Sequence, residues 1–240
     1  MRRPRLVPTL ATALLLPLLI SLGFWQLHRA DVKRALEEAY AQRARAPALD
    51  LARVERWDES RLRYRRARVR GRYLAGRQVL LDNQVHEGRA GYHVLTPLVA
   101  EGMEHCVLVD RGWIPAPGDR SRVPEPGVPA GTVSVRGLLD LAPEPGIRLG
   151  TAVAEPVRWP LVVPWMDPAA LAPHLGCRPV PLVLKMDADL AGGFVRDWRP
   201  VSLQPEKSVS YAVQWFAMAA LLVVIYLVLH LRRRNDDEAT

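Results

Sequence analysis

Residues 6–27 read LVPTLATALLLPLLISLGFWQL, a run of 22 residues without a charged side chain. About 20 consecutive apolar residues are enough to cross the hydrocarbon core of a bilayer. A cleaved signal peptide is the alternative, but its apolar core has about 7–15 residues and precedes a cleavage site made of small residues. This run is longer and ends in the bulky segment Phe24-Trp25-Gln26-Leu27. We therefore predict an uncleaved transmembrane helix.

A second apolar run lies near the other end of the chain. Residues 211–231 read YAVQWFAMAALLVVIYLVLHL and also lack Asp, Glu, Lys and Arg. Three arginines precede the first run, and Arg232-Arg233-Arg234 follow the second. Because short Arg-rich flanks stay in the cytoplasm, both ends of the chain are expected there. The expected order is a cytoplasmic N-terminus (1–5), a first span (6–27), an external loop (28–210), a second span (211–231) and a cytoplasmic tail (232–240).

The compartment follows from the same flanks. Only five residues precede the first span, too few for a mitochondrial transit peptide. We expect a multi-pass protein of the bacterial inner membrane with the loop in the periplasm. The lipid bilayer is then an expected partner.

The loop changes character along its length. Residues 30–46 are rich in helix formers and are expected to continue the first span as a helical stalk that Pro47 ends. Asp167-Pro168 predicts the start of a short helix. Between them, short β-rich runs separated by turn residues predict strands at 64–73, 78–83, 92–99, 105–110, 132–139 and 180–186. The predicted fold class is an α+β membrane protein in which two transmembrane helices flank an antiparallel β-rich periplasmic domain.

The chain is basic, with a formal net charge of +8. Its densest basic run places arginines at positions 61, 63, 65, 66, 68, 70 and 72. Much of this run alternates, as the solvated face of a strand does, and attraction to anionic lipid headgroups is the alternative. Because the topology puts the run outside the cytoplasm, no nucleic-acid partner is expected.

Catalytic motifs are missing from the sequence. It contains no G-x-S-x-G, H-E-x-x-H, G-x-x-x-x-G-K, G-x-G-x-x-G or C-x-x-C-H pattern. Cys106 and Cys177 lie 71 residues apart. We favour two separate buried thiols, with a disulfide or a copper site as alternatives. No two of the six histidines share metal-ligand spacing, so each is expected to be a surface or turn residue. The chain is expected to bind or assemble rather than to catalyse.

Four segments carry a family resemblance. They are LGFWQLHR at 22–29, GYHVLTPL at 91–98, VDRGWIP at 109–115 and YAVQWF at 211–216. In this order they resemble L-G-x-W-Q-L-x-R, G-Y-x-V-x-T-P-L, V-x-R-G-W-x-P and Y-A-x-Q-W-F of the surfeit-locus protein one (Shy-type) family of cytochrome c oxidase assembly factors. For Arg111-Gly112-Trp113 we favour a strand end in which Gly permits a bend and Trp packs in the core. A docking surface for an oxidase subunit is the alternative.

The resemblance implies a function. Members help to mature aa-type cytochrome c oxidase at the stage where haem a enters subunit one. The implied partners are therefore subunit one and the haem a synthesis machinery. The rival class is a periplasmic sensor or transporter accessory subunit, but only Asn-Asp-Asp-Glu-Ala-Thr follows Arg234.

The resemblance also implies transient binding of haem a. Bacterial members have been linked to haem a through a His three residues before the Tyr that opens the second span. Here that position is Ser208, and a hydroxyl does not replace an axial imidazole. Our hypothesis is a haem site at the outer ends of the two spans, formed by Trp25, His28 and Arg29 with Lys207, Tyr211 and Trp215. His28 would supply the imidazole if it lies at the depth of Ser208; ordinary interface aromatics and flanking cations are the alternative.

Overall fold

The computed structural model describes residues 6–142, 150–198 and 203–238. The chain forms two compact units, Met1–Ala39 with Val201–Thr240, and Tyr40–Pro200. We describe each unit by itself.

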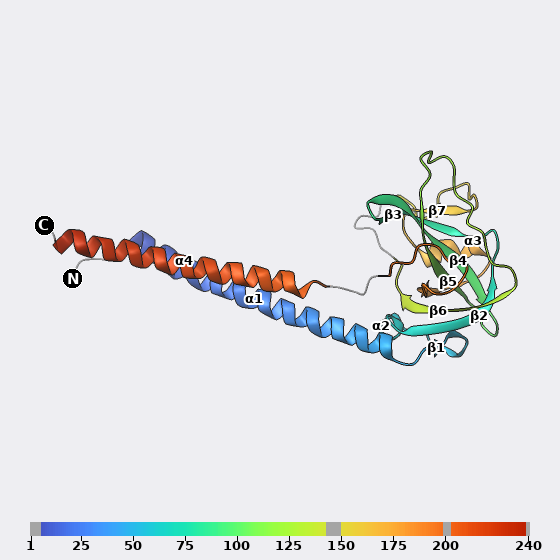
Figure 1. Ribbon diagram of the computed structural model, residues 1–240, viewed down its shortest axis with the longest axis horizontal. Coiled ribbons are helices and arrows are strands. Elements are labelled where there is room, and N and C mark those ends of the chain that lie inside the picture. The colour runs from blue at the N-terminus through green and yellow to red at the C-terminus, as the bar shows by residue number, and fades with distance from the viewer. Residues whose placement is uncertain (1–5, 143–149, 199–202, 239–240) are drawn as a thin grey trace. The chain divides into compact units, whose positions relative to one another are not determined.

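The first unit is a pair of helices. Helices α1 (Leu6–Arg45) and α4 (Pro205–Glu238) lie side by side and antiparallel, since Thr9 contacts Tyr226 and Lys33 contacts Ser208 (Figure 1). Both are long and apolar enough to cross a membrane, by length and composition. The helices approach closely at Gly23, where a Cβ would lie 2.5 Å from the Phe216 ring. Helix α1 continues without a break to Arg45, which confirms the predicted helical stalk.

The second unit is built on one sheet. Its strands are β1 (Leu49–Asp50), β2 (Arg66–Tyr73), β3 (Val79–His86), β4 (Arg89–Ala100), β5 (Cys106–Pro115), β6 (Thr132–Asp140), β7 (Leu161–Val163) and β8 (Pro179–Met186). They pair in the order β1-β2-β6-β8-β5-β4-β3-β7, and β2 also pairs with β4. That additional pairing closes β2, β6, β8, β5 and β4 into a barrel. Gly71 permits the closure, because a Cβ there would lie 2.1 Å from the carbonyl oxygen of Val99. Short helices η1 (Leu51–Arg53) and α2 (Glu59–Leu62) precede β2.

The expectation of an antiparallel sheet is wrong in part. Strand β5 pairs with β8 in parallel, as do β3 with β7 and β1 with β2. Parallel neighbours need long crossover connections. The chain between β5 and β8 supplies one, which includes β6, β7 and helix α3 (Pro168–Leu175). Helix α3 begins as predicted: the Asp167 side chain accepts hydrogen bonds from the N–H groups of Ala169 and Ala170.

The sheet is buried on both faces around β5 and β8. Val107 and Val109 point into a core inside the barrel, whereas Leu108 belongs to a second core outside it. Leu171 and Leu175 of α3 pack in the second core. This double burial explains why β5 begins with an unbroken apolar run at 106–109.

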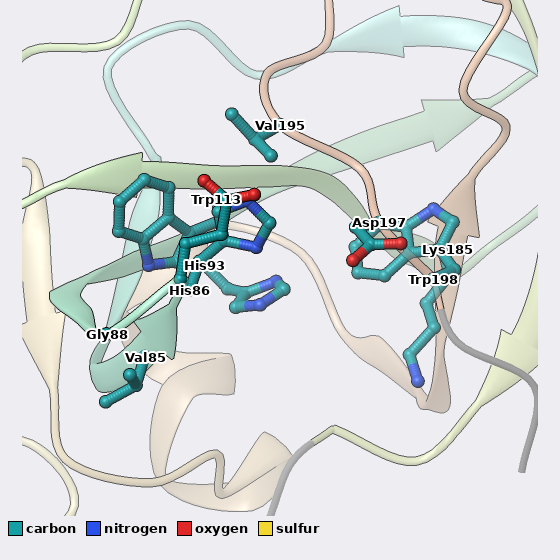
Figure 2. A pocket seen from close by; sticks show the side chains of 10 residues that line it. Val85, His86, Gly88, His93, Trp113, Lys185, Val195, Asp197 and Trp198 are labelled. Carbon is teal, nitrogen blue, oxygen red and sulfur yellow. The ribbon is translucent and has the colours of Figure 1, made fainter.

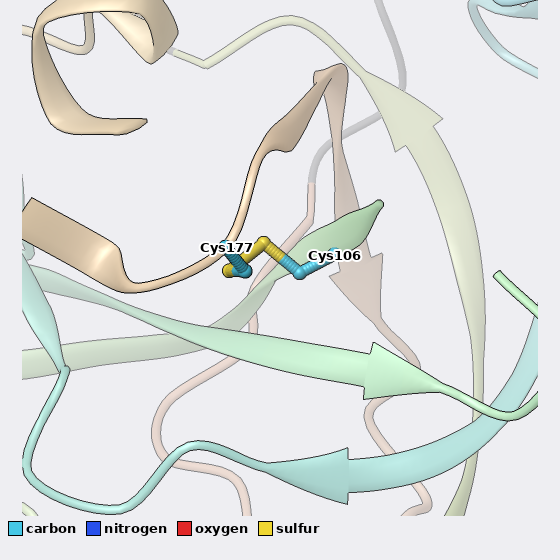
Figure 3. Close-up of a disulfide and its surroundings, with 2 residues drawn as sticks. All are labelled: Cys106 and Cys177. Atoms are coloured by element: carbon cyan, nitrogen blue, oxygen red, sulfur yellow. A yellow bond between two sulfur atoms is a disulfide. The ribbon is translucent and has the colours of Figure 1, made fainter. Parts of the chain in front are cut away.

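Cys106 and Cys177 form a disulfide (Figure 3). The preferred interpretation of two separate thiols is therefore wrong. The 71-residue separation conceals their proximity, because β5 begins beside β8 and Cys106 pairs with Pro179 in the register of the two strands.

Candidate functional site: a cleft beside His93

A cleft of about 580 Å³ opens at one edge of the sheet domain. It is lined by the β3–β4 turn, by β4, β5 and β8, and by the segment after β8; its residues are Val85, His86, Glu87, Gly88, His93, Trp113, Lys185, Val195, Asp197 and Trp198. Figure 2 shows His86, His93 and Trp113 gathered at one end, with Lys185, Asp197 and Trp198 at the other. The size falls within the range of small-molecule sites, roughly 300–1,000 Å³.

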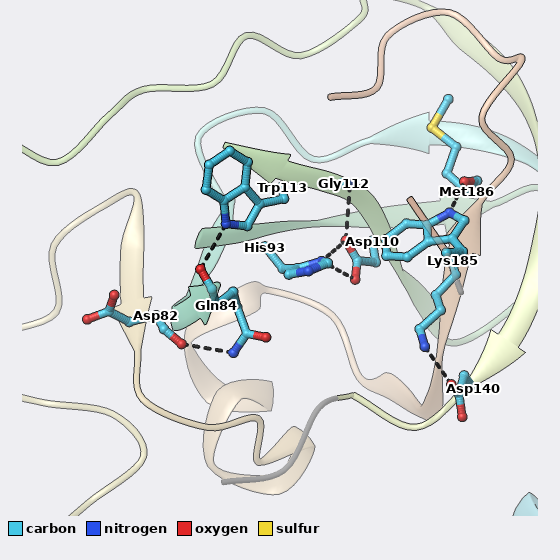
Figure 4. Close-up of polar contacts among 10 residues, drawn as sticks. Asp82, Gln84, His93, Asp110, Gly112, Trp113, Asp140, Lys185 and Met186 are labelled. Carbon is cyan, nitrogen blue, oxygen red and sulfur yellow. Dashed lines mark hydrogen bonds and ion pairs between the residues drawn. The ribbon is translucent and has the colours of Figure 1, made fainter. Parts of the chain in front are cut away.

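The His93 imidazole is held by a buried carboxylate. Nδ1 of His93 lies 2.9 and 3.1 Å from the two carboxylate oxygens of Asp110, whose side chain is 0% exposed (Figure 4). Because an ionised carboxylate only accepts hydrogen bonds, Nδ1 is the ring nitrogen that donates to Asp110, and in the neutral imidazole Nε2 is then the acceptor. The expectation that His93 is a surface or turn residue is wrong: it lies in β4, and its side chain is 18% exposed.

A bulge in β5 brings Asp110 to this position. The β4–β5 register shifts between His93 and Leu95, so that Arg111 and Gly112 together lie opposite Val94. Bulges bend a strand and re-aim its side chains. Gly112 adopts a φ of +111°, and its N–H donates to Asp110 at 3.0 Å. The Gly–Trp bend is thus part of the site.

The segment after β8 packs against this bend. The Trp113 N–H donates to the carbonyl of Val195 at 2.7 Å, and a Cβ at Gly112 would lie 2.5 Å from the same oxygen. Trp113 is buried and its Nε1 donates to the carbonyl of Gln84 at 2.8 Å. The favoured interpretation of Arg111-Gly112-Trp113 is confirmed in part: Gly112 bends the strand and Trp113 is buried, but the segment lies inside β5, which continues to Pro115, and is not a strand end.

Trp198 and Lys185 complete the opposite end of the cleft. The Trp198 ring lies roughly parallel to the His93 ring, with centroids 5.5 Å apart, and its Nε1 donates to the carbonyl of Met186. Lys185 Nζ lies 5.8 Å from the Trp198 ring centroid and donates to Asp140, which also accepts from Arg63. Lys185, Arg63 and Asp140 together carry one positive charge, and the carboxylates of Glu87 and Asp197 also line the cleft. The arrangement offers a fixed imidazole, an indole face and a cation.

The residues predicted at the ends of the spans lie on the helix pair. His28, Arg29, Lys207 and Tyr211 are exposed. The Arg29 guanidinium lies 5.4 Å from the Trp25 ring centroid, which joins two of the predicted residues. Within the described part of the chain, no hydrogen bond, ion pair or ring contact connects the predicted residues of α1 with Lys207, Tyr211 or Trp215.

Ser208 has a different neighbour from the one expected. Its side chain is buried and accepts a hydrogen bond from Lys33 Nζ at 3.0 Å. Lys33 lies five residues after His28, more than one helical turn along α1. Ser208 is therefore opposite Lys33 rather than at the depth of His28, and its occupied hydroxyl does not fit the role of a haem ligand.

The features above define a class: a sheet domain with a ligand-sized cleft, in a chain with two helices apolar enough to be membrane spans. The chain belongs to the SURF1 family, whose sequence profile matches residues 13–220.

Relatives agree with this assignment. The chain is similar to Surfeit locus protein 1 of Takifugu rubripes (23% identity, covering 83% of this chain and 87% of that protein) and of Mus musculus (23%, covering 88% and 72%). A SURF1-like protein of Rickettsia bellii is 29% identical over 98 residues. That alignment spans 40% of this chain and 39% of the Rickettsia protein, about two fifths of the relative's length.

Proposed function

We propose that this protein is an assembly factor for aa-type cytochrome c oxidase, which assists delivery of haem a to subunit one or its maturation. It acts by binding rather than by catalysis, on subunit one and with the haem a synthesis machinery. The observation that carries the proposal is the family match over residues 13–220, together with four family-like segments in order.

The proposed location is the bacterial inner membrane, with the sheet domain in the periplasm. Two helices of sufficient length and the Arg clusters at the chain ends support this topology. The Cys106–Cys177 disulfide supports it independently, since disulfides persist in oxidising compartments such as the periplasm.

Deleting the gene tests the function. Activity of aa-type oxidase in membranes should fall, while respiration through other terminal oxidases stays largely intact, and a plasmid copy should restore the loss. The spectrum of solubilised membranes should show depletion of haem a in subunit one. An equal loss of every terminal oxidase would point to general haem supply and would contradict the proposal.

A haem site at the ends of the spans remains part of the proposal. His28 with Trp25, Arg29, Lys207, Tyr211 and Trp215 stays a prediction, although Ser208 lies opposite Lys33 and not at the depth of His28. Its test is a bound-haem Soret band that His28→Ala abolishes or shifts and Ser208→Ala leaves unchanged.

A further inference from the structure

We propose that the cleft beside His93 receives the arginine side chain of an extended segment of a partner polypeptide. The guanidinium lies at the His93 end of the cleft, and the segment runs along the neighbouring edge of β3. The inference follows from the hydrogen-bonding groups, the charge and the strand edge at the cleft. It therefore goes beyond the proposed function and does not depend on it.

The first argument is the balance of hydrogen-bond donors and acceptors. Three side-chain donors of the cleft are used within the fold: two indole N–H groups donate to backbone carbonyls, and the ammonium of Lys185 donates to Asp140 (Figure 4). Acceptors stay open. Nε2 of His93 has no hydrogen-bond partner among the described residues, and Glu87 is exposed in the turn between β3 and β4. A ligand that donates hydrogen bonds therefore fits these positions.

The second argument is the charge of the lining. It contains two carboxylates, Glu87 and Asp197, and one ammonium, Lys185. Asp140 holds that ammonium at the opposite end of the cleft from His93 (Figure 2). The charge thus favours a cation at the His93 end. The described residues contain no group of three or more His, Cys, Asp or Glu side chains that could hold a metal ion, so the cation is organic.

The third argument is the shape of an arginine side chain. Val85 and Val195, which are 70% and 43% exposed, form apolar walls of the cleft. The methylene stem of an arginine packs on such a surface while its head stays in a polar environment. The planar guanidinium has five donors, enough to reach an imidazole and a carboxylate together, and it stacks on aromatic rings. The compact ammonium of a lysine matches this lining less well.

The fourth argument is the edge of β3. Strand β7 pairs only with Val79–Leu81, so from Asp82 to His86 the described residues give β3 no strand partner on that side. An open strand edge pairs with extended segments of other chains. Val85 and His86 lie on this open part and line the cleft. A segment paired there can place one side chain in the cleft, which makes a polypeptide the source of the arginine.

Peptide titration tests the site. The full-length protein is purified in detergent and titrated by calorimetry with the pentapeptide acetyl-Thr-Val-Arg-Val-Thr-amide. A matched peptide carries citrulline, which has nearly the shape of arginine but no charge. The arginine peptide should bind at one equivalent and about tenfold more tightly than the citrulline peptide, because charge-assisted hydrogen bonds are lost in the latter. A lysine peptide should lie between the two.

Two variants test the two acceptors separately. Glu87→Gln removes a charge from an exposed turn and should weaken the arginine peptide by about 3- to 5-fold. In Asp110→Asn the amide can donate to Nδ1 of His93, which makes Nε2 a donor. Affinity for the arginine peptide should then fall by about tenfold, and the preference over citrulline should shrink. Glu104→Gln, in the exposed turn between β4 and β5 outside the cleft, is the matched control and should bind as the wild type does.

Four outcomes would overturn the proposal. The first is equal affinity for the arginine and citrulline peptides, and the second is unchanged affinity in a Glu87→Gln/Asp197→Asn double variant that circular dichroism shows to be folded. The third is binding of acetyl-arginine amide as tight as that of the pentapeptide, which would mean a free organic cation. The fourth is a dimer of the purified protein that Glu87→Gln dissociates, which would mean a second copy of this chain. The gene-deletion test is independent of these titrations, so the site and the proposed function fail separately.

Discussion

At the scale of single residues, the contacts of Arg111 explain why the first position of the Arg-Gly-Trp segment is an arginine. The residue is 2% exposed, and its side chain donates to the carbonyls of Gly127 and Gly192. The guanidinium also lies 4.9 Å from the Phe194 ring centroid and 5.5 Å from that of Tyr73. Burial lowers the pKa of Arg111, and no ion pair with a carboxylate is found among the described residues. The buried charge is thus stabilised by carbonyl oxygens and aromatic faces, and it ties two loops to the sheet.

Arg111→Lys should therefore destabilise the domain. An ammonium group lacks the planar fork that reaches both loop carbonyls and stacks on the rings. We expect a loss of about 2–4 kcal/mol in the free energy of unfolding, as for a broken buried charged network. Thermal unfolding of the detergent-solubilised protein, followed by circular dichroism, measures it. The matched control is Arg122→Lys, whose side chain is exposed and should change stability little; equal effects would contradict the assignment.

Tyr73 predicts a dependence on alkaline pH. Its hydroxyl is buried without a hydrogen-bond partner among the described residues, and burial raises the pKa of Tyr73 to about 12. The raised pKa means that the folded state favours the neutral phenol. The contribution of Tyr73 to the free energy of unfolding is therefore complete below pH 10, and it is lost as the pH rises through 12. Over that pH range the free energy of unfolding of the wild type should fall by about 2–3 kcal/mol more than that of Tyr73→Phe.

Tyr73→Phe also has an expected effect on stability near neutral pH. Removing an unpaired buried hydroxyl should leave stability unchanged or raise it by about 1 kcal/mol. Unfolding of the two proteins is compared at pH 7, 10 and 11.5, where the other tyrosines contribute equally to both. Parallel pH curves for the two proteins would contradict the burial of this phenol.

At the scale of elements, the disulfide joins the start of β5 to the segment between α3 and β8. It closes a loop of about 70 residues, for which the chain-entropy model gives about 4 kcal/mol of stabilisation. The Cys106→Ala/Cys177→Ala double variant should unfold at a correspondingly lower denaturant concentration. The wild type should change mobility on a gel after reduction, whereas the double variant should not. Free thiols in the purified, unreduced wild type would contradict the bond.

Local sequence patterns predicted most elements but not their pairing. Alternation and turn residues placed six strands within a few residues of their observed bounds, and Asp167 marked the start of α3 correctly. Strands β1 and β7 have two and three residues, too few for a pattern. Parallel pairing of β5 with β8 depends on where a crossover of more than 60 residues returns, which no local signal records. The disulfide was missed for the same reason, because its proximity is a consequence of that pairing.

At the scale of the whole molecule, the cleft was harder to predict than the helices. Its lining comes from segments around positions 86, 113, 185 and 197, which share no spacing rule. One signal was present: Asp110 ends the apolar run Val107–Val109 in a strand, where a carboxylate needs a buried partner. His93, on the neighbouring predicted strand, is that partner. The predicted residues at the ends of the spans were chosen by position, and among the described residues the structure joins only Trp25 and Arg29 of this set.

The last prediction concerns the orientation of the whole chain. Alkaline phosphatase is active only outside the cytoplasm, so a fusion after Gly131, in the loop between the two helices, should be active. A fusion after Thr240 should be inactive, because Arg-rich flanks such as Arg232-Arg233-Arg234 are expected to keep that end in the cytoplasm. A reporter that is active in the cytoplasm, such as β-galactosidase, should give the opposite pattern at the same two positions. The reverse result would place the disulfide and the His93 cleft in a reducing compartment, and the proposed periplasmic role would fall with the topology.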